Sequence, residues 1–124
     1  MCDLGEISKS YTEPTSENSF SSGFERACYL LKTRFINSTI IYIRSHNMSS
    51  RLYDRQIAYG EQGIKIAEKW GIGVIDLYKY MNTQITDYQI KYLSDYTHPN
   101  ELGYNSFYVP SLEKYLYEHR NSEY

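Results

Sequence analysis

Two residues that can move a proton lie close together near the end of the chain. Asp95 and His98 are three residues apart in the stretch 94–104, whose sequence is Ser-Asp-Tyr-Thr-His-Pro-Asn-Glu-Leu-Gly-Tyr. A carboxylate at this spacing can accept a hydrogen bond from an imidazole N–H, fix the tautomer of the ring and stabilise its charged form. The other ring nitrogen is then a general base. The pair could therefore carry out acid–base chemistry, which makes Asp95 and His98 candidate catalytic residues.

The residues after His98 restrict how this pair is presented. Pro99 favours an extended backbone at His98, and Asn100 is a preferred cap for a helix that begins just after it. Short pairs of an acid and a histidine also arise by chance, and they then only stabilise a loop. The spacing alone favours this structural interpretation, so the choice depends on the longer string of residues.

His46 follows an apolar run, and we expect it to line a substrate pocket. A solvated loop histidine is the alternative. Together with Asp76, Asp95 and His98 it could form a zinc or iron site, because two histidines and carboxylates bind both metals. These four residues are spread over three segments without close spacing, so we expect no metal and no other cofactor.

Serine and cysteine side chains give no clear nucleophile. Ser45, Ser49 and Ser50 follow the same apolar run as His46, but no glycine pattern of a nucleophile elbow surrounds them. Cys2 and Cys28 are too few for a disulfide framework, and the chain begins without an export signal. We therefore expect free thiols.

The elements that position the pair follow from hydrophobic periodicity. Residues 1–18 are polar and lack a period, which predicts a loop. Apolar residues at helical spacing predict a helix from near Ser19 to Asn37, with Phe20, Phe24, Ala27 and Leu31 on its face. The runs 39–44 and 74–78 predict strands, and the first is apolar enough to be covered on both faces.

A second helix is predicted between these strands, from Tyr53 to Trp70. Strand, helix and strand in this order predict two parallel strands with a right-handed crossover. A short helix is expected within 79–94, then a last helix from Asn100 towards His119. Pro110 should kink or break the last helix, and residues 120–124 form a tail.

This inventory does not close an α/β domain. Two parallel strands have too few neighbours, and an isolated pair leaves backbone groups and apolar surface exposed along its edges. Either the polar N-terminal segment contains hidden structure, or something outside this chain completes the sheet.

Composition and charge exclude several classes of protein. The chain has 124 residues, of which 41% are hydrophobic and 23% charged, so it forms one folded domain at most. Its net charge of −2 argues against nucleic acid as a partner. No apolar run approaches the roughly 18 residues of a membrane helix. With no signal peptide at its start, we expect a cytoplasmic protein without membrane contact.

The string Asp95-x-x-His98-Pro99-Asn100-x-x-Gly103-Tyr104 resembles the C-terminal part of the SGNH hydrolases, also called GDSL-type esterases and lipases. The resemblance extends back through residues 74–77 with the preceding 68–72, and through 40–48, and it covers most of 4–118. It implies an α/β, flavodoxin-like three-layer sandwich that is incomplete here, with a short parallel sheet and flanking helices. Residues 19–119 form this part of the domain.

The resemblance implies that Asp95 and His98 are the acid and base of a Ser-His-Asp triad. The chain departs from the family because it lacks the Gly-Asp-Ser motif with the nucleophile, the glycine of the second block and the Gly-x-Asn-Asp motif. The missing part would carry about three strands, which the sheet also lacks.

Two functions from different classes follow. The first is a fragment of an ester hydrolase, inactive alone, which acts on a small-molecule or carbohydrate ester. Its partner would be a missing N-terminal half, or a second copy that covers the sheet edge. The second is a non-catalytic domain, derived from a degenerate hydrolase, that binds carbohydrate or protein. Fifteen scattered tyrosines are compatible with a sugar-binding surface.

Overall fold

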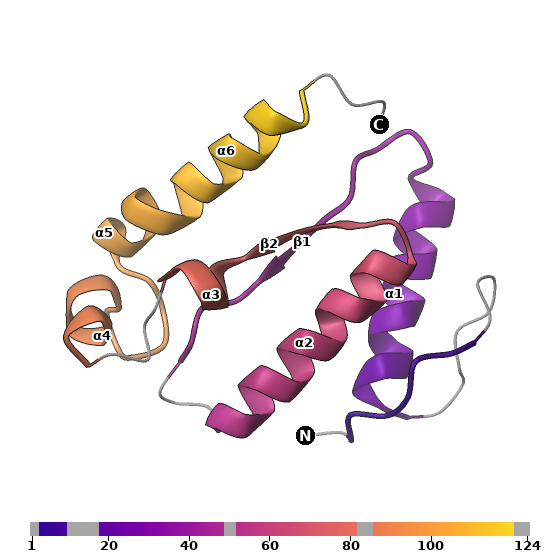
Figure 1. Cartoon of the computed structure of the whole chain (residues 1–124), viewed down its shortest axis with the longest axis horizontal. Helices are drawn as coiled ribbons and strands as arrows, with labels where there is room; N and C mark the ends of the chain where they lie inside the picture. The colour runs from indigo at the N-terminus through magenta and orange to yellow at the C-terminus, as the bar shows by residue number, and fades with distance from the viewer. Residues whose placement is uncertain (1–2, 10–17, 49–51, 82–85, 121–124) are drawn as a thin grey trace. The chain divides into compact units, whose positions relative to one another are not determined.

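The computed structural model describes residues 3–9, 18–48, 52–81 and 86–120 (Figure 1). The strands pair as a short two-stranded parallel sheet, so the protein is of the mixed α/β class, as predicted. The elements are α1 (Phe20–Arg34), β1 (Ile41–Arg44), α2 (Tyr53–Lys69), β2 (Gly73–Asp76), α3 (Leu77–Met81), α4 (Thr86–Tyr92), α5 (Glu101–Gly103), the π-helical η1 (Tyr104–Tyr108) and α6 (Val109–Glu118). Cys2, Ser49, Ser50 and parts of the predicted N-terminal loop and C-terminal tail lie outside the described residues.

The first helix begins where the sequence predicts. The hydroxyl of Ser19 accepts a hydrogen bond from the backbone N–H of Ser22 and caps α1. The second strand is shorter than predicted, and its extension to Tyr78 is wrong. Asp76 accepts a hydrogen bond from the backbone N–H of Lys79 at 3.1 Å. This carboxylate therefore begins α3 at Leu77, directly after the strand.

The last helix, predicted from Asn100 to His119 with a kink or break at Pro110, consists of three segments, α5, η1 and α6. Pro110 is the second residue of α6. Because proline has no N–H to donate to the carbonyl four residues earlier, a regular helix cannot pass through it unchanged. The chain instead widens to π-helical turns before it, and the N–H of Val109 donates to the carbonyl of Tyr104.

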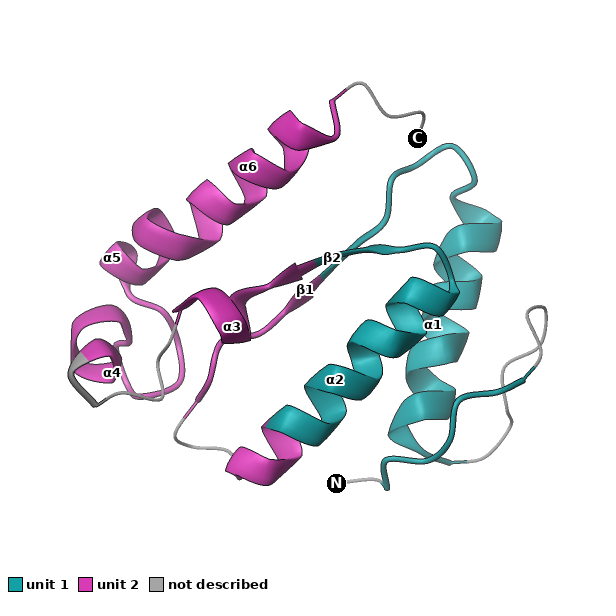
Figure 2. Ribbon diagram, in the orientation of Figure 1, with its two compact units in different colours: residues 1–42, 57–74, 124 teal, residues 43–56, 75–123 magenta. Residues whose placement is uncertain are grey.

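The chain divides into two compact units (Figure 2). The first comprises the described residues within 1–42 and 57–74. Its core is the buried cluster Cys28, Ile66, Ala67 and Ile72, which joins α1 to α2. Cys28 is a free thiol, and burial raises its pKa to about 11.

A buried ion pair holds three segments of the first unit together. Glu25 of α1 is fully buried, and its carboxylate accepts hydrogen bonds from the Lys69 ammonium, the Trp70 indole N–H and the backbone N–H of Ser8. Lys69 also donates to the carbonyl of Ser8. The predicted N-terminal loop is therefore anchored, in its described part, by a charge network.

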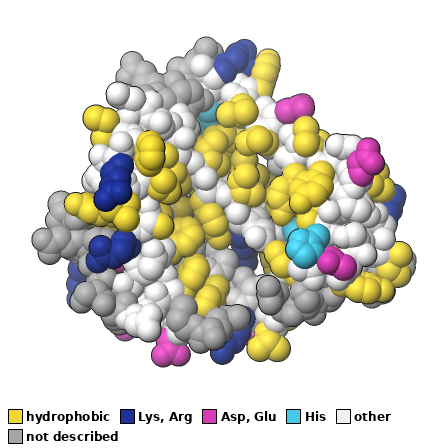
Figure 3. All heavy atoms as spheres, turned by 180° about the vertical axis from the view of Figure 1, so that it is seen from behind, with side chains coloured by type: hydrophobic (Ala, Val, Ile, Leu, Met, Phe, Trp, Pro, Cys, Tyr) yellow, Lys and Arg dark blue, Asp and Glu magenta, His cyan; other side chains and the backbone are white. Residues whose placement is uncertain are grey.

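The second unit comprises residues 43–56 and 75–123. It holds the C-terminal ends of both strands and the helices α3 to α6. None of the side chains of helix α6 is buried. Figure 3 shows hydrophobic side chains exposed on one face of the molecule. No helix within the described ranges is long and apolar enough to cross a membrane.

Candidate functional site

The predicted catalytic residues lie in a tight loop of the second unit. An antiparallel bridge between Leu93 and Pro99 closes the base of the loop. The backbone N–H of Ser94 donates to the carbonyl of His98 at 2.9 Å. Asp95 and His98 are thus held on a short closed loop between α4 and α5, and the backbone sets their separation.

The structure brings Asp95 and His98 together as the sequence predicts. Oδ2 of Asp95 lies 2.7 Å from Nδ1 of His98. Oδ1 accepts hydrogen bonds from the backbone N–H groups of His98 at 2.7 Å and Thr97 at 3.1 Å. The backbone N–H of His98, and next its ring, lower the pKa of Asp95 to about 2. Asp95 is therefore an anion whose two oxygens fix both the loop and the imidazole.

This arrangement sets the tautomer of His98. A carboxylate can only accept, so Nδ1 carries the proton and Nε2 of the neutral ring is left with a lone pair. The imidazole is 73% exposed and the Asp95 side chain 53%. The hydroxyl of Ser94 donates to the backbone carbonyl of His98 rather than to the ring. The pair is thus an imidazole whose Nδ1 is held by a carboxylate and whose Nε2 is open to solvent.

Tyr96 at the tip of the loop has a φ of 62°. This left-handed conformation is unfavourable for a bulky side chain and is found where the surrounding structure enforces it. Here it turns the chain so sharply that one carboxylate oxygen reaches the N–H groups of both Thr97 and His98.

The helix start after the loop is also as predicted. The side chain of Asn100 accepts from the N–H of Gly103 at 2.8 Å and so caps α5. Its amide donates to the carbonyl of Lys91 at 2.9 Å. Asn100 therefore joins α5 to the last turn of α4, on either side of the loop that carries Asp95 and His98.

Gly103 fits where no larger residue can. A Cβ atom here would collide with the backbone carbonyl oxygen of Tyr92 and lie 3.2 Å from both Met81 and Pro99. Gly103→Ala should lower the free energy of unfolding by about 2 kcal/mol, the usual cost of overpacking. Gly23→Ala in α1 is the matched control, because its Cβ meets no atom within 4 Å. Urea unfolding of both variants checks this, and equal midpoints would contradict it.

The predicted pocket residue His46 has a different setting. It is buried, with 3% of its surface exposed. Its Nδ1 lies 2.6 Å from the hydroxyl of Tyr108, and its Nε2 lies 2.6 Å from the carbonyl of Thr97. Both polar atoms of the ring are occupied by the protein, so in this arrangement neither faces a substrate.

Burial also favours the neutral form of His46. Loss of hydration lowers its pKa below 6.5, the bond to Thr97 acts in the opposite direction, and the nearby His98 lowers it further. The carbonyl of Thr97 can only accept, so Nε2 carries the proton and Nδ1 accepts from the hydroxyl of Tyr108.

The lowered pKa of His46 predicts a loss of stability in mild acid. Between pH 6.5 and the lower folded pKa, the unfolded state binds more protons than the folded state. The free energy of unfolding therefore falls as the pH is lowered, by up to about 1.4 kcal/mol per pH unit. Urea titrations from pH 7.5 to 5.5 measure this. His46→Gln should remove this contribution, and an unchanged slope in the variant would refute it.

Asp76, the remaining candidate metal ligand, forms an ion pair instead. Asp76 accepts a hydrogen bond from the Arg44 guanidinium at 3.2 Å, and their side chains are 21% and 9% exposed. This ion pair joins the C-terminal ends of β2 and β1. Among the described residues, no three His, Cys, Asp or Glu side chains lie close enough together to hold a metal ion.

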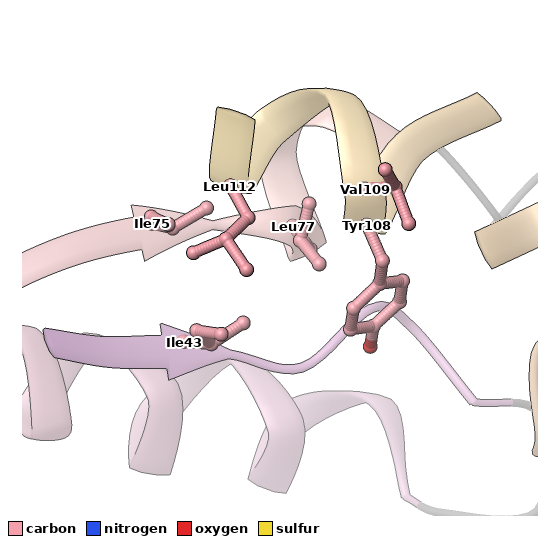
Figure 4. A pocket seen from close by; sticks show the side chains of 6 residues that line it. All are labelled: Ile43, Ile75, Leu77, Tyr108, Val109 and Leu112. Atoms are coloured by element: carbon pink, nitrogen blue, oxygen red, sulfur yellow. The ribbon is translucent and has the colours of Figure 1, made fainter. Parts of the chain in front are cut away.

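A small apolar cavity of about 110 Å³ lies in the same unit (Figure 4). It is lined by Ile43, Ile75, Leu77, Tyr108, Val109 and Leu112. Tyr108 thus lies between this cavity and His46. The other lining side chains are aliphatic, so the cavity offers apolar contact and little polar recognition.

Comparison with protein-family models, with curated proteins and with solved structures finds no match for this chain.

Sequence reasoning missed two residues at this site. Tyr108 and Thr97 hold His46 from segments 62 and 51 residues away. Tyr108 is one of fifteen tyrosines, and Thr97 takes part through its carbonyl, which every residue has. No pattern of residue types distinguishes either one.

Proposed function

We propose that this chain is the C-terminal part of an ester hydrolase of the SGNH type, with the corresponding part of a flavodoxin-like three-layer sandwich. The observation that carries the proposal is the contact between Oδ2 of Asp95 and Nδ1 of His98 at 2.7 Å. It occurs within the Asp-x-x-His-Pro-Asn string. An acid that orients a histidine by Nδ1 is the arrangement a Ser-His-Asp triad requires.

In the complete site, Nε2 of His98 would remove the proton of a serine hydroxyl supplied by the missing half. The serine oxygen attacks the ester carbonyl carbon, and Asp95 stabilises the imidazolium that forms. The imidazolium then gives its proton to the departing alcohol oxygen, which leaves an acyl-enzyme. A water molecule, deprotonated by the same nitrogen, releases the acid and restores the serine. The reaction requires no cofactor.

Exposed apolar surface in the second unit supports a missing half. Ile43 on β1 is 40% exposed, and Val109 and Leu116 on α6 are 45% and 50% exposed. Large apolar side chains gathered at a surface are typical of an interaction site. The described residues also form a sheet of only two strands, too few to stand alone.

The substrate class follows from the proposed chemistry, and we propose a small-molecule or carbohydrate ester cleaved in the cytoplasm. The missing N-terminal half is the preferred partner. A second copy of the chain covering the sheet edge is the other candidate, and sedimentation over a range of concentrations distinguishes the two. Nucleic acid and membranes are not expected as partners.

Supplying the missing half tests the proposal. Fusion of an SGNH N-terminal half, with its Gly-Asp-Ser, glycine and Gly-x-Asn-Asp blocks, to this chain should give hydrolysis of p-nitrophenyl acetate. The chain alone should be nearly inactive, because loss of the triad serine costs about a millionfold in turnover. A folded fusion protein without activity would count against the proposal. DNA upstream of the codon for Met1 that encodes a Gly-Asp-Ser stretch would support it independently.

The alternative is a non-catalytic interaction domain. It is favoured by the absence of a hydroxyl bonded to the His98 ring within the described parts of the chain. This alternative predicts a stable monomer that unfolds cooperatively and binds without turnover. Circular dichroism and gel filtration of the chain by itself separate it from a truncated domain.

A further inference from the structure

The peptide group between Thr97 and His98 is held from both sides. Its carbonyl oxygen lies 2.6 Å from Nε2 of His46. Its N–H donates to Oδ1 of Asp95 at 2.7 Å. In a trans peptide the carbonyl and the N–H point in opposite directions, and the chain contains no cis peptide bond among the described residues. His46 and Asp95 therefore bind this peptide group from opposite sides, directly before the imidazole of His98.

The two hydrogen bonds are made by residues from different parts of the unit. Asp95 belongs to the exposed loop itself, three residues before His98. His46 follows β1 and is buried, and its other nitrogen is held by Tyr108 of η1 at 2.6 Å. A carboxylate on an exposed loop cannot fix the position of that loop relative to the rest of its unit. A buried ring anchored on a strand end and a helix can.

We propose that His46 is a positioning residue, which holds the Thr97–His98 peptide in place so that Asp95 can bind the backbone and the ring of His98 together. Tyr108 assists it by donating to Nδ1, which leaves the proton on Nε2 for the Thr97 carbonyl. The contacts of His46 with Thr97 and Tyr108 place it in this role, and the consequence for catalysis rests on the proposed function.

Two substitutions separate the two bonds of His46. A glutamine side chain extends about as far as Nε2 of histidine, so His46→Gln keeps a donor for the Thr97 carbonyl but loses the acceptor for Tyr108. An asparagine side chain places its amide oxygen near the position of Nδ1, so His46→Asn keeps the acceptor but loses the donor to Thr97. Each variant therefore keeps a different one of the two hydrogen bonds of His46. Both replacement side chains are polar and uncharged.

The readout is the titration of Asp95, followed by NMR through the amide proton of His98, which is bonded to that carboxylate. In the wild type the pKa of Asp95 is about 2. We expect His46→Asn to raise this pKa towards the ordinary 3.8, with faster hydrogen exchange at the His98 amide. His46→Gln should leave the titration as in the wild type. This needs no serine and no activity, so it is independent of the hydrolase proposal.

Three results would overturn the inference. One is an Asp95 titration in folded His46→Asn that matches the wild type while stability falls, which is what a merely structural histidine would give. Another is an equal shift in both variants. The third needs only the wild-type protein, in case His46→Asn does not fold. Long-range nitrogen–proton correlation spectra should show His46 protonated on Nε2, and a proton on Nδ1 would contradict the arrangement.

Discussion

Under the proposed function, His98→Ala should lower the turnover of the fusion protein about a millionfold, because a triad without its base cannot generate the alkoxide. The imidazole Nε2 is the proton acceptor in the proposed reaction. His46 cannot replace it, because both of its ring nitrogens are bonded to the protein. The hydrolysis rate of p-nitrophenyl acetate by the fusion protein measures the loss.

Two further variants make this result specific. Asp95→Asn should reduce turnover about ten-thousandfold, because an amide donor at Oδ2 favours the wrong tautomer of the ring. His119→Ala is the matched control. Nδ1 of His119 lies 2.8 Å from the carbonyl of Tyr115 at the end of α6, so this variant should retain full activity. If His98→Ala and His119→Ala have the same turnover, His98 is not the base.

Lys69→Met should cause the largest loss of stability among single substitutions in the first unit. Glu25 is 0% exposed and the Lys69 side chain 11%, so removing the ammonium leaves a buried carboxylate without a counter-charge. Breaking a buried ion pair in this way costs about 3–5 kcal/mol, a large share of the roughly 5–15 kcal/mol that stabilises a domain. Chemical denaturation followed by circular dichroism measures it.

The double variant Glu25→Gln, Lys69→Met distinguishes the lost charge from lost packing. Without the carboxylate no charge is stranded, so the double variant should regain much of the stability that Lys69→Met loses. Lys114→Ala is the matched surface control. Its partner Glu118 lies 3.9 Å away and both side chains are largely exposed, so we expect no measurable change. A loss in Lys69→Met no larger than in this control would contradict the network.

The sequence predicts the local parts of the candidate site well. Asp95 meets His98 because three residues in a tight loop leave little freedom, and Asn100 caps α5 because its side chain needs only the N–H three residues on. The prediction that failed concerns the end of the second strand, where Asp76 caps α3 and so ends the strand early. The helix irregularity expected at Pro110 is present, in the form of π-helical turns before it.

The amino-acid sequence by itself determined both strands and most of the helices, though not all of their ends, and the contact of Asp95 with His98, because these depend on side-chain period and on groups a few residues apart. Tertiary structure alone decided that His46 is bonded to both Thr97 and Tyr108 and that Lys69 pairs with Glu25. These contacts join residues 44 to 62 positions apart. Such a contact depends on how the elements pack. The sequence does not indicate whether the side chain of a histidine or lysine is bonded to water or to a distant residue.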